Sequence, residues 1–151
     1  MSLIILSSAQ VGVGVQSPAQ FHNALSNTIT IPPNSEVGVC SVKIFRDPAT
    51  LPTDDPGEVF VRSSTLTHQS YNFNKGLPSK ILWGLPRFSN NGALTGCLYY
   101  QQVSPIYLSL NNETPMVIND MEIEFVDKDE VPVTDLTEPS VVVLHIRKSR
   151  A

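Results

Sequence analysis

Hydrophobic and polar residues alternate over short stretches along most of this chain. The most regular stretch places Met121, Ile123 and Phe125 on one phase and Glu122 and Glu124 on the other. Alternation with a period of two residues is typical of a β-strand that buries one face. This stretch therefore predicts a strand whose three apolar residues face a core and whose two glutamates face away from it.

The stretch 27–45 organises the predicted sheets. Ile29 and Ile31 alternate with threonines, a Pro-Pro-Asn-Ser turn follows, and residues 37–45 are apolar on both phases for part of their length. Proline has no amide hydrogen to give to a ladder, so the two prolines lie outside any central strand. A segment that is apolar on both phases is typical of a strand covered on both faces. We therefore expect a strand–turn–strand unit whose second strand lies in the middle of a β-sandwich.

Other short stretches show the same patterns and are separated by turns rich in Pro, Gly, Asn and Asp. They predict strands at 3–6, 58–63, 65–73, 77–85, 94–103, 106–110, 117–126 and 141–148. Only Ser17-Pro-Ala-Gln favours helix, as a single turn with serine at the N-cap, and the same residues also fit an extended chain. Short strands at regular spacing are typical of a β-sandwich or a β-barrel.

The connections at 46–57 and 86–96 are too long for tight hairpins. Long connections suit Greek-key crossovers between two sheets. The pattern therefore predicts an all-β fold, a single jelly-roll β-sandwich of about eight antiparallel strands. We expect residues 1–151 to form this one domain, with residues 1–16 as a candidate N-terminal arm and residues 149–151 as a second flexible end.

The composition indicates an association surface rather than a nucleic-acid surface. Charged residues make up 16% of the chain, against about 25% in an average soluble domain, and a surface poor in charge tends to associate with protein. The net charge is −4, and basic residues cluster only at Arg147, Lys148 and Arg150, which we interpret as a solvated tail. Binding to duplex phosphates usually needs a basic patch, so nucleic acid is not a predicted partner.

Residue types that carry catalysis or bind metals are present but scattered. Cys40 and Cys97 have no zinc or disulfide spacing, and Cys40 is predicted to be a buried small hydrophobe within its strand. His22, His68 and His145 have no second histidine or cysteine at ligand spacing. We therefore predict no catalytic, cofactor-binding or metal site, and we expect the chain not to be an enzyme.

Two further clusters have both a structural and a functional interpretation. The acidic turn 127–130 lacks the glycine and the distal glutamate of a calcium loop, so we interpret it as a solvated turn. Trp83, Phe88, Tyr99 and Tyr100 could form a ligand platform. Aromatic residues more often fill a core or an interface, so we expect these four to do the same.

The N-terminal residues do not match a targeting signal. The run Met-Ser-Leu-Ile-Ile-Leu has no basic n-region and only four consecutive apolar residues. A signal peptide or a membrane span needs a longer apolar stretch. We therefore expect no membrane span, and synthesis in the cytosol or an equivalent compartment.

The central motif resembles a family of viral structural proteins. Phe21-x-Asn23 followed by Ile29-x-Ile31-Pro-Pro-Asn-Ser-Glu-Val-Gly-Val-x-Ser-Val-x-Ile44 is similar to the opening of small jelly-roll virion proteins. These are the single jelly-roll penton proteins, which are minor capsid proteins of virophages and polinton-like viruses. The resemblance implies the same fold as the strand pattern predicts.

The resemblance covers most of the chain, because the segments 114–126 and 142–148 look like the closing strands of the same family. It implies a structural virion protein that forms a homopentamer at each fivefold vertex of an icosahedral capsid. It also implies a double-jelly-roll major capsid protein as the neighbour in the shell. Such a protein is made in the host cell cytoplasm or in a viral factory and resides in the virion.

Two alternative functions remain open. The first is a ligand- or receptor-binding β-sandwich, such as a carbohydrate-binding or attachment head, which predicts an exposed aromatic cluster and a trimer or monomer. The second is an enzyme on a cupin-like barrel, which needs a set of histidine and carboxylate metal ligands. The wide separation of His22, His68 and His145 counts against the enzyme.

Overall fold

The computed structural model describes residues 2–9, 17–46, 58–72, 76–86, 97–133 and 136–149. These residues form eleven β-strands and no helix, which confirms the predicted all-β class. The strands are β1 (Ser2–Ser7), β2 (Gln20–Ile31), β3 (Ser35–Arg46), β4 (Glu58–Arg62), β5 (Ser70–Asn72), β6 (Leu77–Ser79), β7 (Ile81–Pro86), β8 (Cys97–Gln101), β9 (Tyr107–Ser109), β10 (Met116–Val126) and β11 (Leu136–Lys148).

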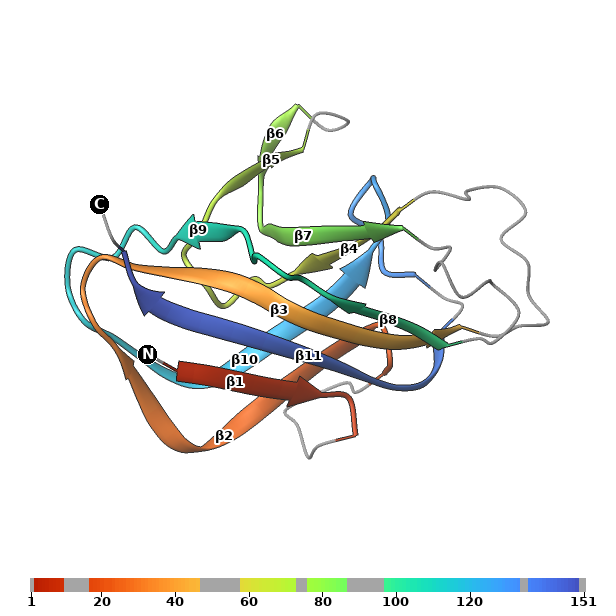
Figure 1. Ribbon diagram of the computed structural model, residues 1–151, viewed down its shortest axis with the longest axis horizontal. Coiled ribbons are helices and arrows are strands. Elements are labelled where there is room, and N and C mark those ends of the chain that lie inside the picture. Colours follow the sequence, from red (N-terminus) through yellow and green to blue (C-terminus); the bar gives the residue numbers. More distant parts are fainter. Residues whose placement is uncertain are drawn as a thin grey trace.

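The strands form two main antiparallel sheets and one small ribbon (Figure 1). The first sheet has the order β1-β11-β3, and β8 and β9 share the position beyond β3 because each pairs with a different part of β3. The second sheet has the order β2-β10-β4-β7. Strands β5 and β6 pair only with each other among the described strands and form the ribbon.

The pairing register decides which side chains meet between the two sheets. In the first sheet, Leu6 lies opposite Val142, and Val142 lies opposite Val42. Partners directly opposite each other in an antiparallel ladder share a face, and all three of these side chains are fully buried. The second sheet contributes its own buried face, and full burial of one such side chain stabilises the fold by roughly 1.5–3 kcal/mol. Its fully buried members include Phe21, Ile31, Val61, Met121, Ile123 and Phe125.

The predicted strand–turn–strand unit is present, but its two strands belong to different sheets. Strand β2 ends at Ile31 in the second sheet, and β3 begins at Ser35 as an internal strand of the first sheet. Asn34 makes the turn with a φ of 57°. The buried Asn112 side chain braces the turn, since its Oδ1 accepts from the Ser35 amide at 3.1 Å and its Nδ2 donates to the Pro32 carbonyl at 2.8 Å.

The predicted helical turn at Ser17 is wrong. The Ser17 amide donates to the Gln20 carbonyl at 2.8 Å and the Gln20 amide donates to the Ser17 carbonyl at 3.2 Å, so the segment is a tight turn that leads into β2. Phe21 and Asn23 are both fully buried at a spacing of two residues, which suits a strand. A helix would place these two side chains on different faces.

The prediction of an N-terminal arm is wrong for its first residues. Strand β1 pairs with β11 along its whole length, from Ser2 to Ser7. The side chains of Ile4 and Leu6 are buried in the core. The separate expectation of an edge strand at 3–6 is therefore confirmed, and residues 10–16 lie outside the described residues.

Two of the predicted strands are shorter or divided. The stretch 77–85 forms β6 and β7, with a break at Lys80, whose ammonium group donates to the His68 carbonyl at 2.9 Å. In the stretch 65–73, the described residues 65–72 contain one strand, the short β5. The long connections at 46–57 and 86–96 lie mostly outside the described residues, but each joins strands of different sheets, as a crossover between sheets requires.

Candidate functional site

The structure does not bring the three histidines together. His22 Nε2 lies 2.7 Å from Asp120 Oδ1 on the neighbouring strand of the second sheet. His68 is buried beside Lys80, and His145 contacts Tyr107 on the first sheet. Within the described ranges, no group of three His, Cys, Asp or Glu side chains is placed to hold a metal ion.

Cys40 is half-buried rather than fully buried, and burial raises the pKa of its thiol. A raised pKa lowers the thiolate fraction at neutral pH, and the thiolate is the reactive form of cysteine. The geometry therefore suits the packing role predicted for Cys40. The side chain of Cys97 lies outside the described part of the chain.

The acidic turn 127–130 forms as predicted but is not entirely solvated. Asp127 Oδ1 accepts from the amides of Asp129 and Val131 at 2.8 and 3.1 Å, which fixes the turn. Glu130 has a φ of 60°, and its side chain is almost completely buried. The turn therefore points one carboxylate inward, toward Arg62.

Arg62 lies between two carboxylates at one end of the second sheet. Glu124 on β10 is its direct partner across the ladder, with 4.0 Å between Arg62 Nε and Glu124 Oε1. Arg62 Nη1 lies 3.9 Å from Glu130 Oε1. The Nε group is buried and has no hydrogen-bond partner, so the guanidinium neutralises charge here without a close bidentate contact.

Glu122 and Glu124 point to the same side of β10 and influence each other. Burial raises the pKa of Glu124, and its hydrogen bond with Glu122 raises it further. Burial also acts to raise the pKa of Glu122, but hydrogen bonds from Ser64 and Glu124, together with the charges of His22 and Arg62, outweigh it and lower that pKa. A proton on Glu124 is therefore favoured over a proton on Glu122.

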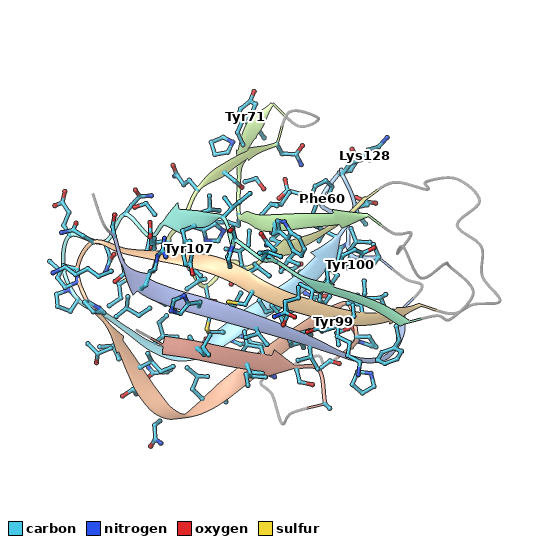
Figure 2. All side chains as sticks on the ribbon, viewed as in Figure 1. Phe60, Tyr71, Tyr99, Tyr100, Tyr107 and Lys128 are labelled. Atoms are coloured by element: carbon cyan, nitrogen blue, oxygen red, sulfur yellow. The ribbon has the colours of Figure 1, made fainter. Side chains whose placement is uncertain are left out.

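A hollow of about 230 Å³ lies beside this cluster, at the base of the β5–β6 ribbon. Its lining combines apolar and charged groups: Arg62, Leu77, Pro78, Ser79, Lys80 and Glu130. The ribbon projects from the sandwich and carries the exposed Tyr71 (Figure 2). Glu130 holds the ribbon in place, because its carboxylate accepts from Ser79 Oγ at 2.8 Å and from Asn72 Nδ2 at 3.2 Å.

A second polar cluster lies on the outer face of the first sheet, around Tyr107 on β9 (Figure 2). The Tyr107 hydroxyl lies 2.6 Å from His145 Nδ1, and Arg147 Cζ lies 3.5 Å from the centre of the Tyr107 ring. Arg147 Nε donates to Glu36 Oε1 at 2.7 Å. Arg147 is therefore paired within the sheet, which corrects its assignment to a solvated tail.

Gly38 makes room for the Tyr107 ring. The two residues lie directly opposite each other in the β3–β9 ladder. A Cβ atom on Gly38 would lie 3.1 Å from Tyr107 Cδ1 and 3.2 Å from the Ile106 carbonyl oxygen. A glycine inside a predicted strand often marks such a close approach, so Gly38 is the sequence signal that could have located this cluster.

The predicted aromatic cluster is only partly assembled. Trp83 and Tyr100 meet edge-to-face with 6.4 Å between ring centres, and both are half-buried against the core. Tyr99 is exposed on the opposite face of β8, since consecutive strand residues point to opposite faces. Phe88 lies outside the described residues. Two of the four aromatics therefore pack against the core as predicted.

Exposed apolar residues gather at the two edges of the first sheet. Leu3 and Ile5 on β1 are 67% and 60% exposed. Val103 and Ile106, between β8 and β9, are 100% and 63% exposed. Water-exposed aliphatic groups near the edges of a sheet are candidates for contact with another protein.

Comparisons with known proteins identify no relative. No family model, no curated protein and no solved structure matches this chain. The described part of the chain also contains no helix long and apolar enough to cross a lipid bilayer.

Proposed function

We propose that this chain is a structural virion protein, a penton-like minor capsid subunit that forms a homopentamer at the fivefold vertices of an icosahedral shell. Its fold in this proposal is a single jelly roll. Its neighbour in the shell is a double-jelly-roll major capsid protein. The chain is made in the host cell cytoplasm or a viral factory, resides in the virion and carries out no chemistry.

The nested order of strand pairs is the observation that carries this proposal. The first strand pairs with the last (β1 with β11), and the second pairs with the one before it (β2 with β10). Strand β3 pairs with β8 and β9, and β4 pairs with β7. A jelly roll can be described as one long antiparallel hairpin rolled around a core into two Greek keys, and this description requires nested strand pairs. The nested pairs therefore support the proposal.

The connections between main strands support the same topology. Each sheet has four strand positions once β8 and β9 are counted as one. Every connection between successive main strands joins one sheet to the other, except the one from β4 to β7. The small ribbon β5–β6 and the division of the β8–β9 position account for eleven strands where about eight are expected in a jelly roll.

The motifs that resemble penton proteins lie on the elements that define this topology. Residues 29–44 cover the end of β2, its turn and most of β3, residues 114–126 cover β10, and residues 142–148 cover the C-terminal half of β11. The exposed apolar residues at the edges of the first sheet and the low charge content suit a subunit that is covered by neighbours.

Native mass spectrometry of the purified protein tests the proposal. We expect particles of five copies, because a closed ring of identical heterologous contacts is the assembly that a fivefold vertex requires. A stable trimer would contradict the vertex assignment and favour an attachment head. If the chain stays monomeric in solution, electron microscopy of shells assembled with the major capsid protein tests the proposal instead. Shells in which this chain is absent from the fivefold vertices would refute it.

The hollow at the base of the β5–β6 ribbon favours one alternative, a ligand- or receptor-binding head. Its lining combines the half-buried Arg62 guanidinium with apolar and charged side chains, below a ribbon that exposes Tyr71. A glycan array tests this alternative, with Tyr71→Ser expected to abolish binding if the ribbon contacts the ligand. Tyr99→Ser is the matched control, since Tyr99 is also exposed but lies on the first sheet. Absence of binding to any glycan would count against a carbohydrate-binding head.

A further inference from the structure

Charged residues are absent from two long segments of the sequence. No Asp, Glu, Lys or Arg precedes Glu36, and none lies between Arg87 and Glu113. Depletion of charge is the compositional signal of the core of a protein–protein interface, because a buried charge without a partner loses its hydration. The two segments therefore require a structural explanation.

The fold places strands of these two segments at opposite edges of the first sheet. Strand β1 comes from the first segment and forms one edge, while β8 and β9 come from the second segment and form the other. Figure 1 shows β1 in red at one edge, with β11 and β3 between it and the green-to-teal β8 and β9. The sheet therefore has two uncharged edge elements separated by two internal strands.

The β1 edge offers both apolar side chains and backbone groups. Leu3 lies opposite His145, and Ile5 lies opposite Val143, on the outer face of the sheet. Asn23 donates to the Ser7 carbonyl and accepts from the Ser7 amide, each at 2.9 Å, so these Ser7 groups point away from β11. Alternate residues of an antiparallel strand direct their backbone groups the same way. The amides and carbonyls of Leu3 and Ile5 therefore also point outward, where no described strand pairs with β1.

The opposite edge carries an apolar projection. After β8, the Gln102 amide donates to the Cys40 carbonyl and its Nε2 donates to the Val39 carbonyl, both at 2.9 Å, which anchors the chain to β3. The chain then leaves the sheet and returns at β9. Between these two anchors, Val103 and Ile106 are exposed to solvent. We call residues 103–106 the β8–β9 projection.

We propose that copies of this chain associate head-to-tail, with the β1 edge of one copy packed against the β8–β9 projection of the next. The inference rests on the proposed function, since it names the surface through which the ring closes. The partner that covers the β1 edge is a second copy of this chain, because both uncharged surfaces belong to one chain and lie at opposite edges of one sheet. A contact between two different surfaces of identical subunits is heterologous and generates a ring when the rotation closes.

The direction of the strands suits this arrangement. All neighbours in the first sheet are antiparallel, so the four strand positions alternate in direction and the two edges run in opposite directions. A second copy placed beside the first in the same orientation therefore brings an antiparallel edge next to β1. The strands that flank the projection, β8 and β9, would then lie antiparallel to β1 of the next copy. Antiparallel edges can satisfy each other's outward amides and carbonyls, as in strand addition to an open sheet.

Charge substitutions at the two edges test the proposal. One variant carries Ile5→Lys on β1, and the other carries Val103→Lys together with Ile106→Lys on the β8–β9 projection. The oligomer of each variant is expected to have a dissociation constant at least about tenfold higher than that of the wild-type oligomer. Val117→Lys is the matched control, because Val117 is 62% exposed on β10 of the other sheet. It is expected to leave the oligomer unchanged, and circular dichroism checks that all variants remain folded.

Mixing the two edge variants separates head-to-tail association from a symmetric contact. Each variant retains one intact edge, so a mixture is expected to give one-to-one heterodimers in native mass spectrometry. If Ile5→Lys dissociates the oligomer but the β8–β9 variant does not, and the mixture gives no heterodimer, the contact is a symmetric β1–β1 pair and the proposal fails. A wild-type chain that remains monomeric at its highest soluble concentration also overturns it.

The same measurements separate this contact from the proposed function. A wild-type pentamer that neither edge variant weakens would refute the head-to-tail contact and leave the vertex function standing. A wild-type dimer or trimer that both edge variants dissociate, and whose variants form the heterodimer, would support the contact and refute the pentameric vertex.

Discussion

Glu124 lies on the polar phase of the most regular strand of the chain, yet it is only 7% exposed. Alternation correctly directs it away from the core between the sheets. Arg62, whose Nε lies 4.0 Å from Glu124 Oε1, and Glu130, whose charge acts on Glu124, then lie close to it. The phase of a strand residue therefore predicts its face, whereas its burial depends on what other elements place above that face.

His68 gives a residue-scale prediction about pH. Burial lowers its pKa, the hydrogen bond from Nε2 to the Lys80 carbonyl opposes this, and the Lys80 charge lowers it further. The unfolded chain therefore takes up a proton near pH 6.5 that the folded chain resists. We expect the free energy of unfolding to fall as the pH drops below about 6.5, because the unfolded state binds more protons.

Urea unfolding at several pH values between about 5 and 7.5 measures this effect. His68→Gln keeps an N–H donor for the Lys80 carbonyl but does not titrate in this range, so it is the comparison variant. As the pH falls, the free energy of unfolding is expected to decrease more for the wild type than for the variant. A difference that stays constant across the range would contradict a buried, neutral His68.

At the scale of elements, the β5–β6 ribbon depends on a residue that is distant in sequence. Glu130 accepts hydrogen bonds from Ser79 and Asn72, and Asn72 also donates to the Lys128 carbonyl at 2.9 Å. A two-stranded ribbon alone is marginally stable in water. The ribbon is therefore held by the turn between β10 and β11 in addition to its own ladder.

Glu130→Ala is expected to loosen this ribbon. It removes the carboxylate that accepts from Ser79 Oγ, one of the acceptors of Asn72 Nδ2, and one of the two carboxylates beside Arg62. A buried polar group left unpaired costs about 1–3 kcal/mol. Amide hydrogen exchange is expected to rise in β5 and β6 while β3 and β11 stay protected. Asp129→Ala is the control, because the Asp129 side chain is exposed in the same turn. Equal exchange in wild type and Glu130→Ala would show that the ribbon is stable by itself.

At the scale of the whole molecule, the first and last strands close the sheet. Strand β1 is one edge, and its pairing with β11 joins residues from opposite ends of the sequence. The buried side chains of Ile4 and Leu6 reach the core shared by both sheets. Residues 2–7 are therefore part of the folded core rather than an arm.

Leu6→Ala tests this placement of β1. Leu6 is fully buried, and truncation of a buried leucine typically costs about 2–5 kcal/mol of stability. Leu3→Ala in the same strand is the control, with an expected change within about 0.5 kcal/mol because Leu3 is exposed. Thermal and urea unfolding measure both variants. A Leu6→Ala variant as stable as wild type would mean that this segment is not part of the core.

The sequence by itself determined the local features of this protein. Period-two alternation located β4, β10 and β11, and proline and asparagine located the turn between β2 and β3, because strand faces and turn geometry depend on neighbouring residues. The edge strand at residues 3–6 was also evident from a short apolar run.

Only the tertiary structure decided which strands are partners and what lies over each face. The turn after Ile31 leads into the other sheet, Tyr107 lies over Gly38, and Glu130 lies beside Arg62. These relations join residues far apart in the chain, and alternation carries no information about the partner of a strand. For the same reason the sequence alone does not relate the two uncharged segments, whereas the fold places β1 of the first and β8 and β9 of the second at opposite edges of one sheet.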